Sequence, residues 1–272
     1  MNRCRAGAQV LLILVVLSAG ALAQDGSIGS ITKGYGEIVV IRAAGGEESA
    51  GVGTAIFQQD QIYVGADGLA TVTFIDETIV TLGANSALTI DEMVFDPASQ
   101  ANSGLLSLAG GVMGLVSGQI VKSGDMTVTT PVSTIGIRGT SVLIDTGFVA
   151  QLGSAGIATV EATGAGGESI SLVLSQDGSL GLVQVTTASG ETFTLDVFGA
   201  TVFIDPATGT TTFGSSTATD IQERFGAVLQ ALNNAAGRDL TDPENATEAD
   251  EVKRSIDDLL ELLQIENQAS DD

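Results

Sequence analysis

The composition of this 272-residue chain excludes several common kinds of catalytic and metal site. It has no histidine and one cysteine, Cys4, so it cannot build a Ser-His-Asp triad, an internal disulfide or a zinc site of the usual ligand types. Its 33 acidic and 10 basic residues give a net charge of −23, which repels nucleic acid and anionic lipid and favours cationic partners.

The first 23 residues have the pattern of a cleavable secretory signal. Two arginines precede a short apolar run at 10–17, and small residues follow at Ala21 and Ala23, so we expect cleavage between Ala23 and Gln24. An uncleaved anchor is the alternative, but a membrane span needs about 20 apolar residues. We therefore expect no stable membrane span after cleavage, and a location in the periplasm, the medium or the cell surface of a Gram-negative bacterium.

The chain beyond the signal has the pattern of an all-β protein. Short runs rich in Val, Ile, Thr and Phe alternate with Gly, Asp, Asn and Ser clusters, and in Ala70–Phe74 every second residue is apolar, as in a half-buried strand. The clearest expected strands are Glu37–Ile41, Leu69–Ile75, Thr78–Leu82, Ala87–Ile90, Met126–Thr130, Ser141–Ile144, Ile157–Glu161, Ile170–Leu174, Leu180–Thr186, Thr192–Val197 and Thr201–Ile204. From Ile157 to Phe213 the strands follow one another as rungs with glycine-containing corners, although their period is uneven. The pattern predicts a mainly β fold, with a solenoid-like or twisted β domain.

The apolar segment Leu105–Val121 allows two interpretations. It contains four glycines, and each glycine costs a helix interior about 1 kcal/mol relative to alanine. We therefore expect buried β structure with tight corners, and a transmembrane helix is the alternative.

The segment from Thr130 to Thr140 combines turn residues with a rare basic residue. Pro131 lacks a backbone donor and biases Thr130 toward extended geometry, so the chain is expected to turn here. Gly136 and Gly139 flank Ile137-Arg138 and predict a bulge or corner.

Arg138 is expected to stabilise the fold. Its planar guanidinium suits an internal ion pair with Asp125 or Asp145, or a clamp on backbone carbonyls, and a ligand-facing arginine is the alternative. The first interpretation predicts that Arg138→Ala lowers the melting temperature.

The pattern changes to helical after Gly214. Apolar residues recur at helical spacing in Ala218–Ala236 and again in Glu248–Glu266, with a break at Asp242-Pro243. Residues 217–272 hold 14 acidic and 4 basic residues. We expect a short α-helical pair that covers an open end or edge of the β domain, and a hairpin for dimerisation or partner docking is the alternative.

Three segments together resemble the FecR-type domain family, over about Val52–Phe148. They are Asp60–Gly68, Ala70–Ser86 and Val128–Thr140, and Glu77 stands where the family usually has glycine. The resemblance implies a structural motif at Thr130, Pro131, Gly136, Arg138, Gly139 and Thr140. The expected organisation is a signal at 1–23, an N-terminal β segment at 24–51, a FecR-like β domain at 52–148, a β extension packed on it at 149–214, and an acidic amphipathic helical tail at 217–272.

The resemblance and the missing residue types favour an exported non-enzymatic module for envelope sensing. We expect a protein partner in the cell envelope, no nucleic acid and no cofactor, with a homo-oligomer through the C-terminal helices as a further option. Known FecR regulators carry a cytoplasmic sigma-binding segment, and we expect none here because only the signal precedes the mature chain. A calcium-stabilised surface or adhesion-type β protein is the alternative, although no Asp-x-Asp-x-Asp-Gly loop is present. A carboxylate hydrolase is disfavoured because Asp76-Glu77 and Asp91-Glu92 are neighbours that point to opposite faces of a strand.

Overall fold

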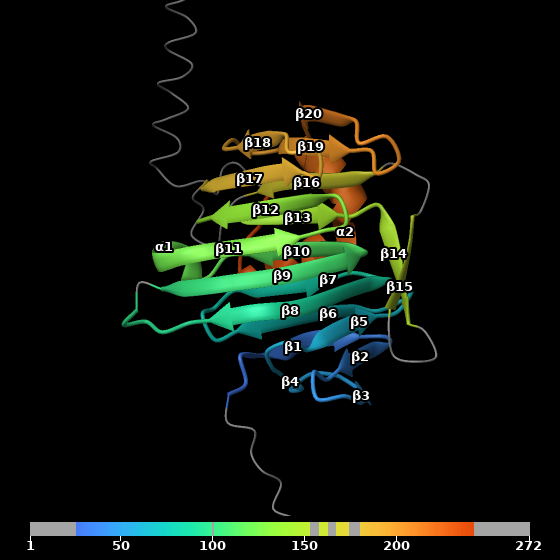
Figure 1. The fold of residues 1–272 in the computed structure, drawn as a ribbon, viewed down its shortest axis with the longest axis vertical. Coiled ribbons are helices and arrows are strands. Elements are labelled where there is room, and N and C mark those ends of the chain that lie inside the picture. The colour runs from blue at the N-terminus through green and yellow to red at the C-terminus, as the bar shows by residue number, and fades with distance from the viewer. Residues whose placement is uncertain (1–25, 100, 153–157, 163–166, 174–179, 242–272) are drawn as a thin grey trace, which may run out of the picture.

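Most of the molecule consists of two β-sheets packed face to face (Figure 1). The structure is a computed structural model, and it describes residues 26–99, 101–152, 158–162, 167–173 and 180–241. The predicted mainly β fold is confirmed, and each of the two large sheets has nine strands. Neither sheet closes on itself.

The two sheets are named A and B. Sheet A has the order β20 (Thr211–Ser215), β19 (Ala200–Ile204), β16 (Glu168–Val173), β13 (Ser141–Asp145), β10 (Val112–Val116), β7 (Ile79–Leu82), β6 (Leu69–Phe74), β1 (Gly29–Tyr35) and β4 (Ala55–Ile56). Sheet B has the order β18 (Thr192–Leu195), β17 (Leu182–Thr187), β12 (Ser133–Arg138), β11 (Gly124–Thr129), β9 (Asn102–Gly110), β8 (Ser86–Val94), β5 (Gln61–Val64), β2 (Ile38–Ile41) and β3 (Glu47–Ser49). A separate hairpin joins β14 (Phe148–Leu152) to β15 (Ala158–Ala162), and the short helix α1 (Ile120–Ser123) precedes β11.

The strands in each sheet follow nearly the order of the chain, which gives the fold its solenoid-like character. Figure 1 shows this progression from β3 and β4 at one end of the molecule to β18 and β20 at the other. Neighbouring strands are antiparallel except for the parallel pair β9 and β11. The expected β extension continues both sheets, since β16 pairs with β13 and β17 pairs with β12.

The core lies between the sheets and follows the two-residue period of the strands. Buried and partly exposed positions alternate along the whole of β9. In β12, Ile135 and Ile137 are buried inward, whereas Thr134 and Arg138 face outward and are exposed. This alternation leaves a polar outer face on the part of sheet B formed by β11, β12 and β17.

Helix α2 (Ala218–Ala236) covers the outer face of sheet A, with its bounds as predicted. Its buried residues are Ile221, Phe225, Val228, Leu229 and Leu232. Close packing is possible because Gly83 and Gly114 lack side chains: a Cβ at Gly114 would lie 2.9 Å from the Leu232 side chain. The expectation that this helix covers an edge or an open end is therefore wrong. Its apolar face is used within the chain, and the second expected helix, Glu248–Glu266, lies outside the described residues.

Most of the apolar segment Leu105–Val121 forms strands, as expected, and its last two residues belong to α1. Strands β9 and β10 are joined at Gly111, whose φ of 89° is a left-handed conformation that glycine adopts without strain. Within the described part of the chain, no helix has both the length and the apolarity to cross a bilayer.

We expect Glu77→Gly to stabilise the protein. Glu77 is exposed in the turn between β6 and β7 with a φ of 71°, which is strained for a residue with a Cβ. Relief of about 1–2 kcal/mol exceeds the entropy cost of glycine, about 0.5–1 kcal/mol, so the melting temperature should rise by about 1–4 °C in a calorimetric scan. Asn85→Gly is the control, because asparagine tolerates its φ of 53° and should gain less. A lower melting temperature for Glu77→Gly would contradict this account.

Candidate functional site

The structure places the motif residues predicted from the sequence in three parts of the fold. Thr130 and Pro131 lie in a turn, Gly136 and Arg138 lie on the outer face of sheet B, and Gly139 and Thr140 form a corner. The turn lies between β11 and β12, where the Thr130 backbone N–H donates to the Ser133 carbonyl at 2.9 Å. The Thr130 hydroxyl accepts from the backbone N–H of Ser133 at 3.0 Å and of Val132 at 3.3 Å. The turn predicted at Pro131 is confirmed, and Pro131 itself is exposed.

A buried carboxyl group lies beside this turn. Glu168 on β16 crosses the gap between the sheets, is fully buried, and accepts a hydrogen bond from the Ser133 hydroxyl. Its other oxygen, Oε2, has no hydrogen-bond partner among the described residues. Burial raises the pKa of Glu168 from 4.5 to about 7; hydrogen bonds from Ser133 and Thr130 act to lower it, and nearby Asp145 acts to raise it.

The corner lies between β12 and β13. Gly139 has a φ of 65°, which explains glycine there, and the buried Thr140 hydroxyl donates to the Val173 carbonyl at 3.0 Å. The corner expected at Gly139 is confirmed. The other outcome left open, a bulge, does not occur at Gly136, because β12 pairs in regular register with β11 and β17 on both sides.

Arg138 lies on the outer face of sheet B, so the expectation of an internal ion pair or carbonyl clamp is wrong. It does pair with Asp125, with 3.5 Å between Nη2 and Oδ1, but the two side chains are 72% and 78% exposed. A pair so exposed contributes about 0–1 kcal/mol. The alternative, a ligand-facing Arg138, stays a prediction, and the exposure of the side chain is compatible with it.

Arg42 has the internal contacts that were expected of Arg138. Its guanidinium donates to the Asp60 carboxylate at 2.5 Å, to the Ala55 carbonyl at 2.9 Å and to Glu48, and it lies over the Phe57 ring at 5.3 Å. The Asp60 side chain is only 2% exposed, and it also accepts from the Phe57 backbone N–H at 2.9 Å. This arginine ties β2 and β3 to the loop before β5.

A shallow hollow of about 360 Å³ surrounds Arg138 on the outer face of sheet B. Gly136 lines it, and an added Cβ at this position would meet only the Gln184 carbonyl, at 3.9 Å. The side chains that point outward here are polar apart from half-exposed Leu182, and they include the Arg138–Asp125 pair, an amide and several hydroxyls. Met126 and Ile137 also line the hollow, but their side chains are buried. The lining residues are Asp125, Met126, Thr127, Thr134, Gly136, Ile137, Arg138, Leu182, Gln184 and Thr186.

Outward hydroxyls extend this polar face across sheet B. Thr134 of β12 lies between Thr129 of β11 and Thr186 of β17 in the strand register. The row continues through hydroxyl pairs between Thr129 and Ser107 at 2.8 Å, and between Thr186 and Thr192 at 3.3 Å. The face therefore presents many hydrogen-bonding groups to a partner.

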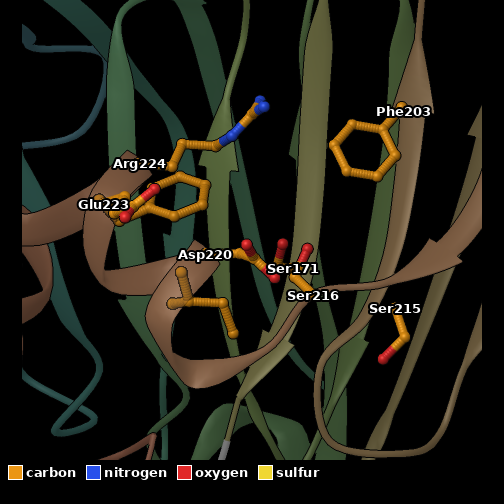
Figure 2. A pocket seen from close by; sticks show the side chains of 9 residues that line it. Ser171, Phe203, Ser215, Ser216, Asp220, Glu223 and Arg224 are labelled. Carbon is orange, nitrogen blue, oxygen red and sulfur yellow. The ribbon is translucent and has the colours of Figure 1, made fainter.

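A second hollow, of about 540 Å³, lies between the first turns of α2 and the outer face of sheet A (Figure 2). Figure 2 shows Asp220, Glu223 and Arg224 on the helix side and Phe203 on the sheet. The Arg224 guanidinium lies 5.4 Å from the centre of the Phe203 ring. Asp220 is committed to the helix cap with Thr217, which lowers its pKa, so the helix end is already satisfied.

No site with the geometry of a metal centre occurs in the described ranges, where no three Asp, Glu, His or Cys side chains gather closely enough to hold an ion. The calcium alternative therefore finds no support there. The expected cleavage residues Ala23 and Gln24 lie outside those ranges.

Two notable residues, Glu168 and Arg42, were missed by the sequence analysis. A signal existed for Glu168, because it continues the inward set formed by Ile170 and Leu172 at two-residue spacing. No local signal marks Arg42, whose buried partner Asp60 follows 18 residues later in the chain.

Comparison with known proteins identifies one family and a distant structural likeness. Residues 60–162 match the family described as "FecR protein". Two crystal structures of a protein described as a candidate anti-sigma factor from Parabacteroides distasonis show 14% and 13% identity, each with a TM-score of 0.42. The alignments cover 64% and 65% of this chain and 73% and 74% of those chains. No protein with a curated description matches the sequence.

Proposed function

We propose that this chain, which carries a FecR domain at residues 60–162, is an exported, non-enzymatic module that acts by protein–protein contact in the cell envelope. The observation that carries the proposal is the exposed polar face of sheet B around Arg138, most of which lies within the matched residues. Exposed polar side chains that contribute little to the stability of the fold favour a role in contacts with another molecule.

The chemistry of this face indicates the kind of partner. Arg138, Gln184 and the surrounding hydroxyls form hydrogen bonds readily, and half-exposed Leu182 adds a small apolar contact. The chain carries a net charge of −23, so a partner with a basic surface is attracted over a distance and binds less well at high salt. Location outside the cytoplasm rests on the secretory signal expected at 1–23.

We expect Arg138→Ala to impair partner binding with little effect on stability. The free energy of unfolding should fall by less than about 1 kcal/mol, because the ion pair with Asp125 is exposed. In capture from envelope extract, the wild-type chain should retain a specific protein that Arg138→Ala and Gln184→Ala lose.

Lys33→Ala is the matched control, since Lys33 is an exposed basic residue on sheet A. It removes one positive charge, as Arg138→Ala does, and should leave capture unchanged. Equal capture by all three variants would show that this face does not bind the partner. A loss of more than about 3 kcal/mol of stability in Arg138→Ala would restore the structural role first expected for it.

A further inference from the structure

The four edge strands of the two sheets differ in how they are protected against pairing with another chain. At one end of the molecule, β4 has only two residues, and β3 is a three-residue strand that begins Glu47-Glu48. Short length and charge are the usual means by which natural proteins block edge pairing. At the other end, β18 is flanked by exposed Glu191 and Asp196.

Strand β20 has none of these protections. It is a five-residue strand, Thr211–Ser215, at the end of sheet A, with no charged residue, proline or bulge. No charged residue occurs between Asp205 and Asp220, an uncommon interval in a chain with a net charge of −23. Phe213 at its centre is 53% exposed although it lies on the inward side of the sheet, opposite buried Val202.

The backbone groups of β20 that point away from the sheet can be assigned from the hydrogen-bond register. Asp205 N–H donates to the Thr210 carbonyl and Ser216 N–H donates to the Gly199 carbonyl, so even-numbered residues of β20 bond to β19. Thr211, Phe213 and Ser215 then present their N–H and C=O groups outward. Within the described part of the chain no strand accepts them.

We infer that β20 pairs antiparallel with β20 of a second copy of this chain, about a two-fold axis at Phe213. In that register Phe213 opposes Phe213 of the other copy, and Thr211 opposes Ser215, so every outward N–H meets an outward C=O. A two-fold interface requires such self-complementarity, and opposed aromatic residues across strands are favourable. The absence of charge also makes β20 suited to contact between two strongly acidic chains.

The dimer is expected to be weak and to strengthen with salt. Pairing of one five-residue strand buries less than the roughly 1,000 Å² typical of a stable interface. Each copy is acidic, and screening of their repulsion at an ionic strength of about 1 M should favour association relative to about 0.01 M. A basic partner on β20 would show the opposite dependence on salt.

Sedimentation of the purified chain over a range of concentrations tests the dimer. Phe213→Pro should weaken association by at least about tenfold. Proline removes the backbone N–H of residue 213, which points outward, and leaves the hydrogen bonds between β20 and β19 intact. Phe213→Lys introduces a charge at the axis and should have the same effect even if Phe213→Pro distorts the strand. The proposal is overturned if the wild-type chain stays monomeric throughout, or if both variants associate as it does.

Cysteine cross-linking tests the register. In a Cys4→Ser background, Phe213→Cys should form a disulfide dimer, because paired Cα atoms about 5.5 Å apart suit a disulfide. Val197→Cys is the matched control, since Val197 is 54% exposed at the same end but lies outside β20. Equal cross-linking of both cysteines, or none at position 213, would exclude this register.

The same experiments separate the dimer from other possibilities. If residues 242–272 cover β20 within one chain, Phe213→Lys changes the melting temperature while sedimentation stays monomeric, which overturns the dimer. Arg138 lies on sheet B, so Arg138→Ala should leave the association of two copies unchanged. One experiment can therefore contradict the proposed dimer without contradicting the proposed binding role of sheet B, and the reverse also holds.

Discussion

Replacing Glu168 with glutamine is expected to stabilise the protein by about 3 kcal/mol above pH 7. Glu168 is buried between the sheets with one oxygen that lacks a hydrogen-bond partner among the described residues, so its ionised form is costly there. Glutamine has nearly the same size and keeps an oxygen that can accept from Ser133. It carries no charge at any pH.

The sign of the effect follows from the pKa of Glu168. The folded protein raises this pKa from 4.5 to about 7, so folding favours the neutral acid. This contribution of Glu168 to the free energy of unfolding is complete below about pH 4.5 and is lost as the pH rises through about 7. The difference between the two pKa values corresponds to about 3 kcal/mol. Wild type and Glu168→Gln should therefore have similar stability near pH 4 and diverge up to about pH 7.

Urea unfolding of both proteins at several pH values measures this difference. Glu191→Gln is the matched control, because Glu191 is exposed and its change removes the same single charge from an acidic chain. It should show no comparable divergence between pH 4.5 and 7. Parallel pH profiles for wild type and Glu168→Gln would mean that Glu168 is ionised in the folded state without a net cost.

Arg42→Ala is expected to destabilise the protein by about 3 kcal/mol. The change leaves the buried carboxylate of Asp60 without its cation, and removal of one partner from a buried ion pair typically costs about 3–5 kcal/mol. Arg42 is 22% exposed, so solvent can replace part of the interaction and the lower end of that range is expected. Loss of packing on Phe57 adds to the effect.

Arg138→Ala provides the comparison for Arg42→Ala in the same unfolding experiment. Both changes remove one guanidinium from an ion pair with an aspartate, but the Arg42 pair is buried at Asp60 and Arg42 also contacts Ala55, Glu48 and Phe57. A double change, Arg42→Ala with Asp60→Asn, should recover part of the loss because no buried charge remains. Similar losses for the two single arginine changes would show that burial of Asp60 is not the cause.

The sequence predicts elements well where the pattern is local and poorly where partners are distant. Helix Ala218–Ala236 was predicted to the residue because the apolar spacing that marks it lies within the segment itself. The two glycines flanking Ile137-Arg138 left a bulge and a corner both open, and only the pairing of β12 with β11 and β17 shows that the strand is regular up to Arg138.

The candidate site shows the same limit. Thr130 and Pro131 predicted a turn correctly, but the sequence could not show that Glu168 lies beside them, 35 residues after Ser133. Arg138 was assigned the internal role that Arg42 fulfils. The partner of Arg42, Asp60, lies 18 residues later in the chain, and only the pairing of β2 with β5 brings the two residues together.

The order of the strands in the two sheets affects where strands can be gained or lost without unfolding the rest. Most strands pair with partners that are close in the chain, so each part of the sheets is supported mainly by its immediate neighbours, as in a repeat protein. Strands added or lost at an end leave the pairing elsewhere intact, whereas a deletion in the middle, beneath α2, disrupts both the sheets and the helix. The fold therefore tolerates the gain or loss of strands at its two ends better than in its middle.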